Sequence, residues 1–255
     1  MKIFDFNIHF PSSEKNSTEY FIASELQATD NEISQRVANS NYKVEGANIM
    51  VFNPNINDFS KIRKVSSNKF KKHLITQLVN PDDYEKNISS LDIDAIKFHV
   101  YHQNITSDQY DRILQICINS NKIIAIDTSY GSSKMYINKP LELASLIVDQ
   151  IKDKPIILLH SGGAKCMEAL LLAESQDNVF LETSFTYNYY FGSSISHDLN
   201  FIYNKLGADK IIFGSDSPYC DQSTQLIQIN KVLDDIGFDE YAKSKVFYKN
   251  ALSLI

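Results

Sequence analysis

Eight short apolar runs, rich in Ile, Val and Phe, recur along the 255-residue chain and alternate with stretches of helical periodicity. Runs of this kind are typical of buried strands, and strands that alternate with helices form parallel sheets. This alternation limits the fold class more than any other feature of the sequence, because it requires an α/β architecture. The predicted strands are Lys2–His9, Ala47–Asn53, Leu74–Asn80, Ala95–Tyr101, Ile123–Thr128, Ile156–His160, Val179–Ser184 and Ile211–Asp216.

The segments between the apolar runs carry start and stop signals of helices. Pro140 stands where a first helical turn would begin, and Gly207 stands where a helix would stop. Two further helical patterns, near Leu226–Ile236 and Tyr241–Leu254, follow the last predicted strand. We therefore expect a covering helix after each strand and an extra C-terminal helix.

The eight β-α units can close into a barrel or open into a doubly wound sheet. Doubly wound sheets that bind dinucleotides carry a Gly-x-Gly-x-x-Gly turn after the first strand, and no such turn occurs here. Barrels of eight units typically use about 250 residues as one domain. The sequence therefore predicts a single-domain (β/α)8 TIM barrel over residues 1–255, with the doubly wound sheet as the alternative.

Charge and apolar content exclude several classes of protein. The formal net charge of −6 is spread along the chain, so no basic stretch for a phosphate backbone or an anionic membrane is visible. No apolar run approaches the roughly 18 to 20 residues of a membrane span. Three widely spaced cysteines, Cys117, Cys166 and Cys220, favour a reducing compartment. We expect a cytoplasmic protein that binds a small molecule, binds neither nucleic acid nor a membrane, and can form a homo-oligomer.

Polar side chains gather where the predicted strands end. Residues two apart in a strand point to one face, so Asn7 and His9 can point into a barrel mouth together. A closed barrel brings all strand ends to one centre, where barrel enzymes place their active sites. Their recurrence on several strands favours a functional site over isolated structural hydrogen bonds. The set is Asn7, His9, Asn53, Lys97, His99, Asp127, His160, Glu182, Ser184 and Asp216.

Three long connections leave the carboxyl ends of strands, the side that carries substrate-binding loops in barrel enzymes. They are Phe10–Asp30, Ser129–Lys139 and Phe185–Ser196. The last begins with an aromatic segment, Phe185–Phe191, which either stacks on a planar or sugar-like substrate or packs over the helices. We expect substrate contacts from Lys97, His99, Tyr187, Tyr189 and Tyr130.

Short motifs at the strand ends add a resemblance to a known family. Asp5-Phe6-Asn7-Ile8-His9, Leu159-His160-Ser161-Gly162-Gly163 and Phe213-Gly214-Ser215-Asp216-Ser217-Pro218 resemble the first-, sixth- and eighth-strand motifs of the amidohydrolase-2 branch of the amidohydrolase superfamily. Ile96-Lys97-Phe98-His99, Leu181-Glu182-Thr183-Ser184 and Asn250-Ala251-Leu252 add to the resemblance. The six motifs follow the expected order and span nearly the whole chain. The resemblance implies a TIM barrel.

The resemblance also implies roles for individual residues. Asp216 would be a metal-binding carboxylate and proton acceptor, and His9 the second histidine of a His-x-His pair. His160 would be a polarising or general acid-base histidine near the metal. A metal can generate hydroxide near neutral pH, and a neighbouring carboxylate and imidazole can move its protons. Asp216 and His160 are therefore the predicted catalytic residues.

Two positions depart from the pattern of the family. Asn7 replaces the first histidine of His-x-His, and Asp127 stands where a histidine ligand is usual on strand five. A divalent metal, zinc or manganese, would be held by His9, Asp216, Asp127 and Asn7, a set that is richer in oxygen than zinc prefers. Equally, the chain could bind no metal. Asn7 would then hydrogen-bond strand-end backbone, and Asp127 would cap a loop or pair with Lys97. Lys97 could alternatively be a modified bridging ligand of a binuclear centre, although the other ligands of such a centre are depleted.

These features leave three functions open. The first is a metal-dependent hydrolase that cleaves an ester, lactone or amide bond of a small polar molecule. The second is a decarboxylase, because some members of the resembled family decarboxylate aromatic acids. The third is a degenerate, metal-free barrel that binds a ligand or partner without turnover. His160 and Asp216 favour an enzyme, whereas Asn7 and Asp127 favour the degenerate barrel.

Overall fold

The computed structural model describes residues 1–10, 43–52, 54–55, 58–83, 88–217 and 219–255. All eight predicted strands are present, and they form one sheet in the order of the sequence, with every neighbouring pair parallel. Their bounds are β1 (Lys2–Phe10), β2 (Lys43–Val51), β3 (Lys72–Leu78), β4 (Ala95–Phe98), β5 (Ile123–Asp127), β6 (Ile156–Leu159), β7 (Val179–Glu182) and β8 (Ile211–Ile212).

The segment from β8 onward closes the sheet against β1. The Phe6 amide donates to the Phe213 carbonyl at 3.0 Å, and the His9 amide donates to the Ser217 carbonyl at 2.7 Å. Ile8 and Ser217 also form a parallel bridge. The prediction of a TIM barrel is therefore confirmed, and the alternative prediction of an open doubly wound sheet is wrong.

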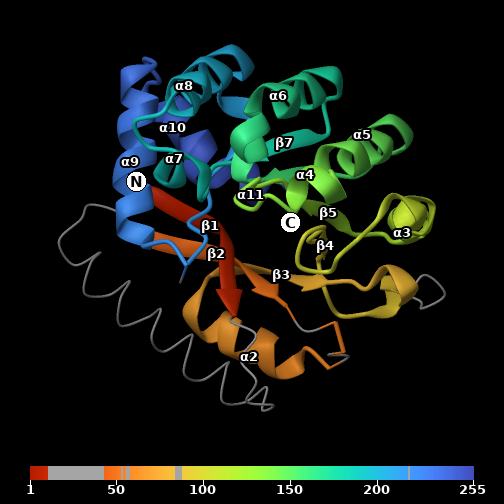
Figure 1. The fold of residues 1–255 in the computed structure, drawn as a ribbon. Helices are drawn as coiled ribbons and strands as arrows, with labels where there is room; N and C mark the ends of the chain where they lie inside the picture. The colour runs from red at the N-terminus through yellow and green to blue at the C-terminus, as the bar shows by residue number, and fades with distance from the viewer. Residues whose placement is uncertain (11–42, 53, 56–57, 84–87, 218) are drawn as a thin grey trace.

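α-Helices follow β2 and β4 to β8 and lie outside the strands, as Figure 1 shows for α5, α6 and α8. After β3, where a covering helix was also expected, the described residues form only two 3-10 turns, Pro81–Asp83 and Ile88–Ser90. Pro140 occupies the first turn of α5 and Gly207 ends α8, as the sequence predicts. The predicted connection Phe10–Asp30, apart from Phe10 itself, and Asn53 of the predicted polar set lie outside the described residues. The helices are α2 (Ser60–Lys69), α3 (Tyr110–Asn119), α4 (Met135–Asn138), α5 (Pro140–Gln150), α6 (Cys166–Ser175), α7 (Thr186–Tyr189), α8 (Ser194–Leu206), α9 (Gln222–Asp235), α10 (Glu240–Ser244) and α11 (Asn250–Leu252).

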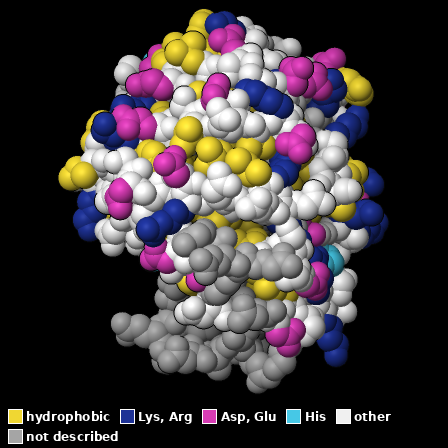
Figure 2. All heavy atoms as spheres, turned by 90° about the vertical axis from the view of Figure 1, so that its right-hand side faces the viewer, with side chains coloured by type: hydrophobic (Ala, Val, Ile, Leu, Met, Phe, Trp, Pro, Cys, Tyr) yellow, Lys and Arg dark blue, Asp and Glu magenta, His cyan; other side chains and the backbone are white. Residues whose placement is uncertain are grey.

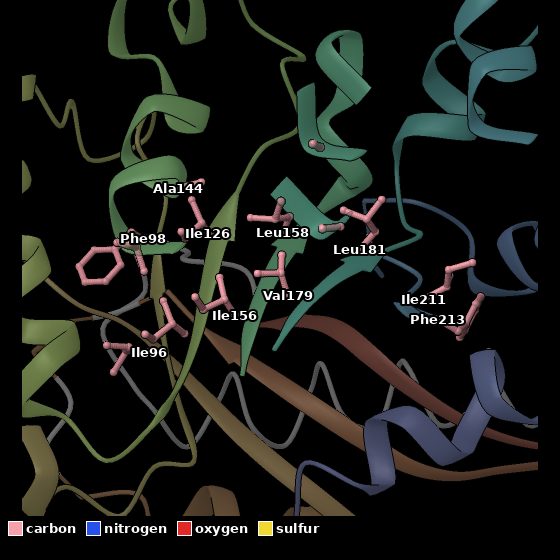
Figure 3. Packing of buried hydrophobic residues seen from close by; sticks show 14 of the residues in the cluster. Ile96, Phe98, Ile126, Ala144, Ile156, Leu158, Val179, Leu181, Ile211 and Phe213 are labelled. Carbon is pink, nitrogen blue, oxygen red and sulfur yellow. The ribbon is translucent and has the colours of Figure 1, made fainter. Parts of the chain in front are cut away.

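Strand alternation divides the buried apolar residues into two layers. One layer lies between strands and helices, and Figure 3 shows Ile126 of β5 and Leu158 of β6 in it with Ala144 of α5. The other, which includes Ala95 and Ala125, comes from the alternate positions of the strands. Lys97 and Asp127 are two residues beyond these alanines, so the same strand faces become polar where the strands end. The fold therefore places polar side chains at the carboxyl-terminal mouth of the barrel.

The surface carries charges of both signs. Figure 2 shows Lys and Arg side chains interspersed with Asp and Glu side chains on the face it displays, with hydrophobic side chains between them. No helix among the described residues is long and apolar enough to span a membrane. All three cysteines, Cys117, Cys166 and Cys220, are free thiols.

Candidate active site

A cavity of about 650 Å³ opens where the strands end. Both predicted catalytic residues, Asp216 and His160, line it, although they are 7% and 3% exposed. The other lining residues are His9, Phe52, His99, Tyr101, His102, Asp127, Ser129, Gly131, Ser132, Phe185, Asn188, Tyr189, Tyr219 and Cys220. The barrel therefore brings residues from distant parts of the sequence to one chemical centre.

Three side-chain nitrogen atoms of the site lie close to the carboxylate of Asp127. Its Oδ2 lies 3.2 Å from His160 Nε2, 3.5 Å from His99 Nε2 and 3.6 Å from Lys97 Nζ. Its Oδ1 accepts hydrogen bonds from the amide and hydroxyl of Ser129, at 3.2 and 2.9 Å. Burial opposes ionisation of Asp127, but the neighbouring histidines and Lys97 hold its pKa well below the usual range. Asp127 is thus a carboxylate with both oxygens occupied.

His160 lies between two carboxyl groups, one in direct contact and one reached through a serine. Its Nδ1 is 2.9 Å from Ser184 Oγ, and that hydroxyl donates to Glu182 Oε2 at 2.8 Å. Burial lowers the pKa of His160, but Asp127 and more distant carboxylates outweigh burial and raise it to about 9. The ring is therefore an imidazolium near neutral pH, with Nδ1 donating to Ser184 and Nε2 donating to Asp127.

Asn7 joins the same network instead of bonding backbone, which was one of the alternatives for it. Its amide nitrogen donates to Ser184 Oγ at 3.0 Å. The serine oxygen thus accepts from Asn7 and His160 and donates to Glu182, which uses its full hydrogen-bonding capacity. Glu182 also accepts from the His160 amide at 3.1 Å, and burial raises its pKa. This network links the ends of β1, β6 and β7 and fixes the orientation of the His160 ring.

The backbone is strained at both predicted catalytic residues. His160 has a φ of 67° and Asp216 a φ of 63°, in the left-handed region that few residues other than glycine adopt. Gly163 lets this turn approach β5, because a Cβ there would lie 1.7 Å from the Ser129 carbonyl oxygen. Strained backbone of this kind clusters at functional sites. It explains why the sequence carries Gly162-Gly163 directly after the strand-six histidine.

Asp216 and His9 form a second contact in the mouth. His9 Nε2 lies 2.9 Å from Asp216 Oδ1. Burial opposes ionisation of Asp216, but contact with His9 and the charges of His160 and Lys97 lower its pKa. Burial and the positive charge of Lys97 lower the pKa of His9. Asp5 supports this side of the mouth, because its Oδ1 accepts from the Ser215 amide at 2.9 Å.

The predicted substrate-binding residues have different positions. His99 and Tyr189 line the cavity, and burial lowers the pKa of His99 to about 4, so its ring is neutral near pH 7. Lys97 is buried and is not among the lining residues, with Nζ 4.8 Å from the centre of the Phe52 ring. Tyr187 and Tyr130 do not line the cavity.

Helix geometry accounts for Tyr187. The segment Thr186–Tyr189 forms one turn, α7, in which residues two apart point in different directions. Tyr189 therefore reaches the cavity and stacks on Phe185 at 4.7 Å, while the ring of Tyr187 contacts Phe191. Tyr130 is buried against Tyr136. The structure therefore does not bring these two tyrosines into the lining of the cavity.

Several lining residues were not predicted from the sequence. Phe52 directly follows β2, His102 lies in the loop after β4, and Cys220 lies four residues beyond Asp216. Phe52 contacts the rings of His9 and His102, at 4.8 and 5.5 Å. Their position in the sequence could have identified them, because each of these residues follows a strand end on the loop side of the barrel.

The four predicted metal ligands do not come together as a binding site. Among the described residues, no group of three or more His, Cys, Asp or Glu side chains is arranged to hold a metal ion. Asp127 pairs with Lys97 and His160, and Asn7 turns its amide nitrogen to Ser184, so only His9 and Asp216 remain in contact. Two donors do not make a zinc or manganese site of the usual kind. The residues present therefore do not fit the predicted metal.

We expect Ser184→Ala to lower the free energy of unfolding by about 1–3 kcal/mol, the cost of leaving buried polar groups unpaired. The change removes the acceptor of Asn7 and His160 and a donor to Glu182. Ser175→Ala is the matched control, because Ser175 is exposed and its hydroxyl donates to the Leu172 carbonyl of its own helix. Urea unfolding of both variants measures the difference. Equal stabilities would show that the Ser184 network contributes nothing.

Comparison with known sequences places the chain in a family. The sequence model described as "Amidohydrolase" matches residues 83–255, which is more than half of the chain. No functionally curated protein matches the chain. Members of the matched family usually bind a divalent metal.

Solved structures share the fold at low sequence identity. An uncharacterized TIM-barrel protein from Bordetella bronchiseptica is 13% identical, with a TM-score of 0.71 over 100% of this chain and 98% of that one. A probable 2-pyrone-4,6-dicarboxylic acid hydrolase from Acinetobacter baumannii is 14% identical, with a TM-score of 0.61 over 100% and 99%. The 5-carboxyvanillate decarboxylase of Sphingomonas paucimobilis is 10% identical, with a TM-score of 0.60 over 99% and 98%. At such identities the likeness establishes the barrel fold alone.

Proposed function

We propose that this chain, which belongs to the amidohydrolase family, is a hydrolase that cleaves an ester, lactone or amide bond of a small molecule at the barrel mouth. One observation carries the proposal. A single cavity presents an ionised carboxylate, Asp216, and an imidazolium, His160, whose pKa values are shifted in opposite directions. Titratable pairs whose environments separate their pKa values are typical of a catalytic base and a catalytic acid.

The pair can carry out both proton transfers of hydrolysis. Asp216 accepts a proton from water while the water oxygen attacks the carbonyl carbon. The His160 imidazolium stabilises the developing oxyanion and then protonates the leaving oxygen or nitrogen as its bond to carbon breaks. The products are a carboxylic acid and an alcohol or amine. Transfer of the proton from Asp216 to His160 through water restores both groups.

The walls of the cavity favour a flat substrate. Phe52 follows β2, Phe185 and Tyr189 follow β7, and Tyr219 follows β8. Rings that approach from several strand ends can stack on the faces or edges of a planar molecule. The cavity of about 650 Å³ is in the range that encloses a small organic ligand. A small cyclic lactone or an aromatic ester is the substrate class that fits these walls.

Decarboxylation of an aromatic acid is the second candidate, and His160 is the observation that favours it. An imidazolium donor in the cavity can protonate the carbon that loses carbon dioxide. The solved structures with this fold include a decarboxylase of 5-carboxyvanillate. The two reactions differ in product, because only decarboxylation releases carbon dioxide and only hydrolysis consumes water.

A substrate panel tests the proposed function. The purified full chain is incubated with small cyclic lactones, aromatic esters, amides and hydroxylated aromatic acids, and acid release and carbon dioxide are recorded separately. We expect acid release from at least one lactone or ester. Release of carbon dioxide without release of acid from any lactone, ester or amide would show that the protein is a decarboxylase and not a hydrolase. Binding without turnover of any compound would favour the degenerate barrel.

A further inference from the structure

We propose that the barrel mouth is a metal-independent centre in which the Lys97 ammonium supplies the fixed positive charge that a divalent ion supplies in most members of the family. The proposal concerns the same cavity as the proposed hydrolysis and deepens it. Its central measurement, metal binding, needs no substrate. Failure of the proposed hydrolysis and failure of this inference are therefore distinguishable.

Asp127 offers no free oxygen to a metal. Its Oδ1 accepts two hydrogen bonds from Ser129. Its Oδ2 faces nitrogen atoms of His160, His99 and Lys97, all within 3.6 Å. A metal ion could reach this carboxylate only by displacing groups that already compensate its charge.

Lys97 places a buried positive charge beside Asp127. The side chain is 2% exposed, and the Phe52 ring lies 4.8 Å from Nζ. Nζ has no hydrogen-bond partner within the part of the chain that the structure describes, and its ion pair is with Asp127 at 3.6 Å. An ammonium has three donors and no lone pair, so it cannot bind a metal. It also repels a dication brought into the same low-dielectric mouth.

The remaining predicted ligands are too few to hold a metal. His9 and Asp216 are in contact at 2.9 Å, and the nearest predicted third ligand, Asn7, directs its amide nitrogen to Ser184. This leaves Asn7 with one amide oxygen, a weak neutral ligand. The two positions that lack the usual histidine ligands therefore lie in the same centre as a buried cation, Lys97.

Elemental analysis of the full-length protein tests the inference directly. The protein is expressed with added zinc and manganese, dialysed without chelator, and analysed for bound metal. It is then titrated with Mn²⁺ alone and with Zn²⁺ alone by calorimetry. We expect substoichiometric metal and no saturable binding of either ion. One equivalent of metal retained through dialysis, or a saturable one-to-one titration, would overturn the proposal.

The variant Lys97→Met tests whether the charge of Lys97 prevents metal binding. It keeps an apolar stem and removes the charge, so Mn²⁺ binding should become saturable, at an affinity about 10-fold or more above the weakest that the titration of the natural protein can detect, within the 10–100-fold range of changes beside metal sites. Lys243→Met is the matched control, because Lys243 is also buried and paired with carboxylates, Asp234 and Glu240, but does not line the cavity. No gain in Lys97→Met, or an equal gain in the control, would refute the role of Lys97. If Lys97→Met fails to fold, the titration of the natural protein still decides whether the centre binds metal.

Discussion

Asp216→Asn should lower kcat/KM for the best substrate of the panel by about 10²- to 10⁴-fold, the usual contribution of a general base. The amide keeps the shape of the carboxylate but has neither its charge nor its basic oxygen. Asparagine also tolerates the positive φ of 63° at this position better than most residues do. The fold should therefore survive the change, and the loss should be chemical.

Asp177→Asn is the control for this experiment. The Asp177 side chain is fully exposed, with Lys210 as an ion-pair partner at 3.9 Å, and it lies outside the lining of the cavity. We expect turnover by this variant to equal that of the natural protein. Circular dichroism and thermal unfolding check that both variants are folded. Undiminished turnover by folded Asp216→Asn would remove Asp216 from the mechanism.

His160→Asn should produce a loss of similar size, about 10²- to 10⁴-fold in kcat/KM, because it removes the proposed acid. The asparagine amide can still donate toward Ser184, where His160 Nδ1 now lies 2.9 Å from Oγ. It cannot reproduce the contact of Nε2 with Asp127 or carry the proton. Asparagine again suits the backbone, since φ is 67° at this position.

The pH dependence of the His160→Asn variant separates catalysis from structure. The natural protein should lose activity as pH rises through about 9, where His160 gives up its proton. The residual activity of the variant should not show this loss. His197→Asn, an exposed position on α8, is the control and should keep the natural profile. A variant that retains the decline near pH 9 would assign that decline to another group.

The architecture could be predicted because it depends on local periodicity. Each strand is a short apolar run, and alternation within the run already separates the face packed on helices from the face that enters the barrel. Pro140 and Gly207 mark helix ends through backbone constraints that act within a single turn. The convergence of Asp216 and His160 then follows from closure, because all strand ends meet at one mouth.

The contacts within the site could not be predicted in the same way, because they depend on register between strands. Lys97 pairs with Ala125 across β4 and β5, which puts Asp127 at the diagonal position within reach of a long side chain. This register makes Asp127 the partner of Lys97, one of the alternatives that the sequence left open, and removes it from the predicted metal ligands. The Ser184 network depends likewise on how the ends of β1, β6 and β7 meet.

The pH profile of kcat/KM for the natural protein tests the central claim, that Asp216 acts ionised and His160 acts protonated in one cavity. The pKa of Asp216 is lowered, so its carboxylate is retained above about pH 4 and activity should fall only below that. The pKa of His160 is raised to about 9, so its proton is present below that pH and activity should fall above it. Because kcat/KM reports the pKa values of groups in the free enzyme, we expect kcat/KM to be constant between these two pH limits. Activity that rises through pH 9 would contradict it.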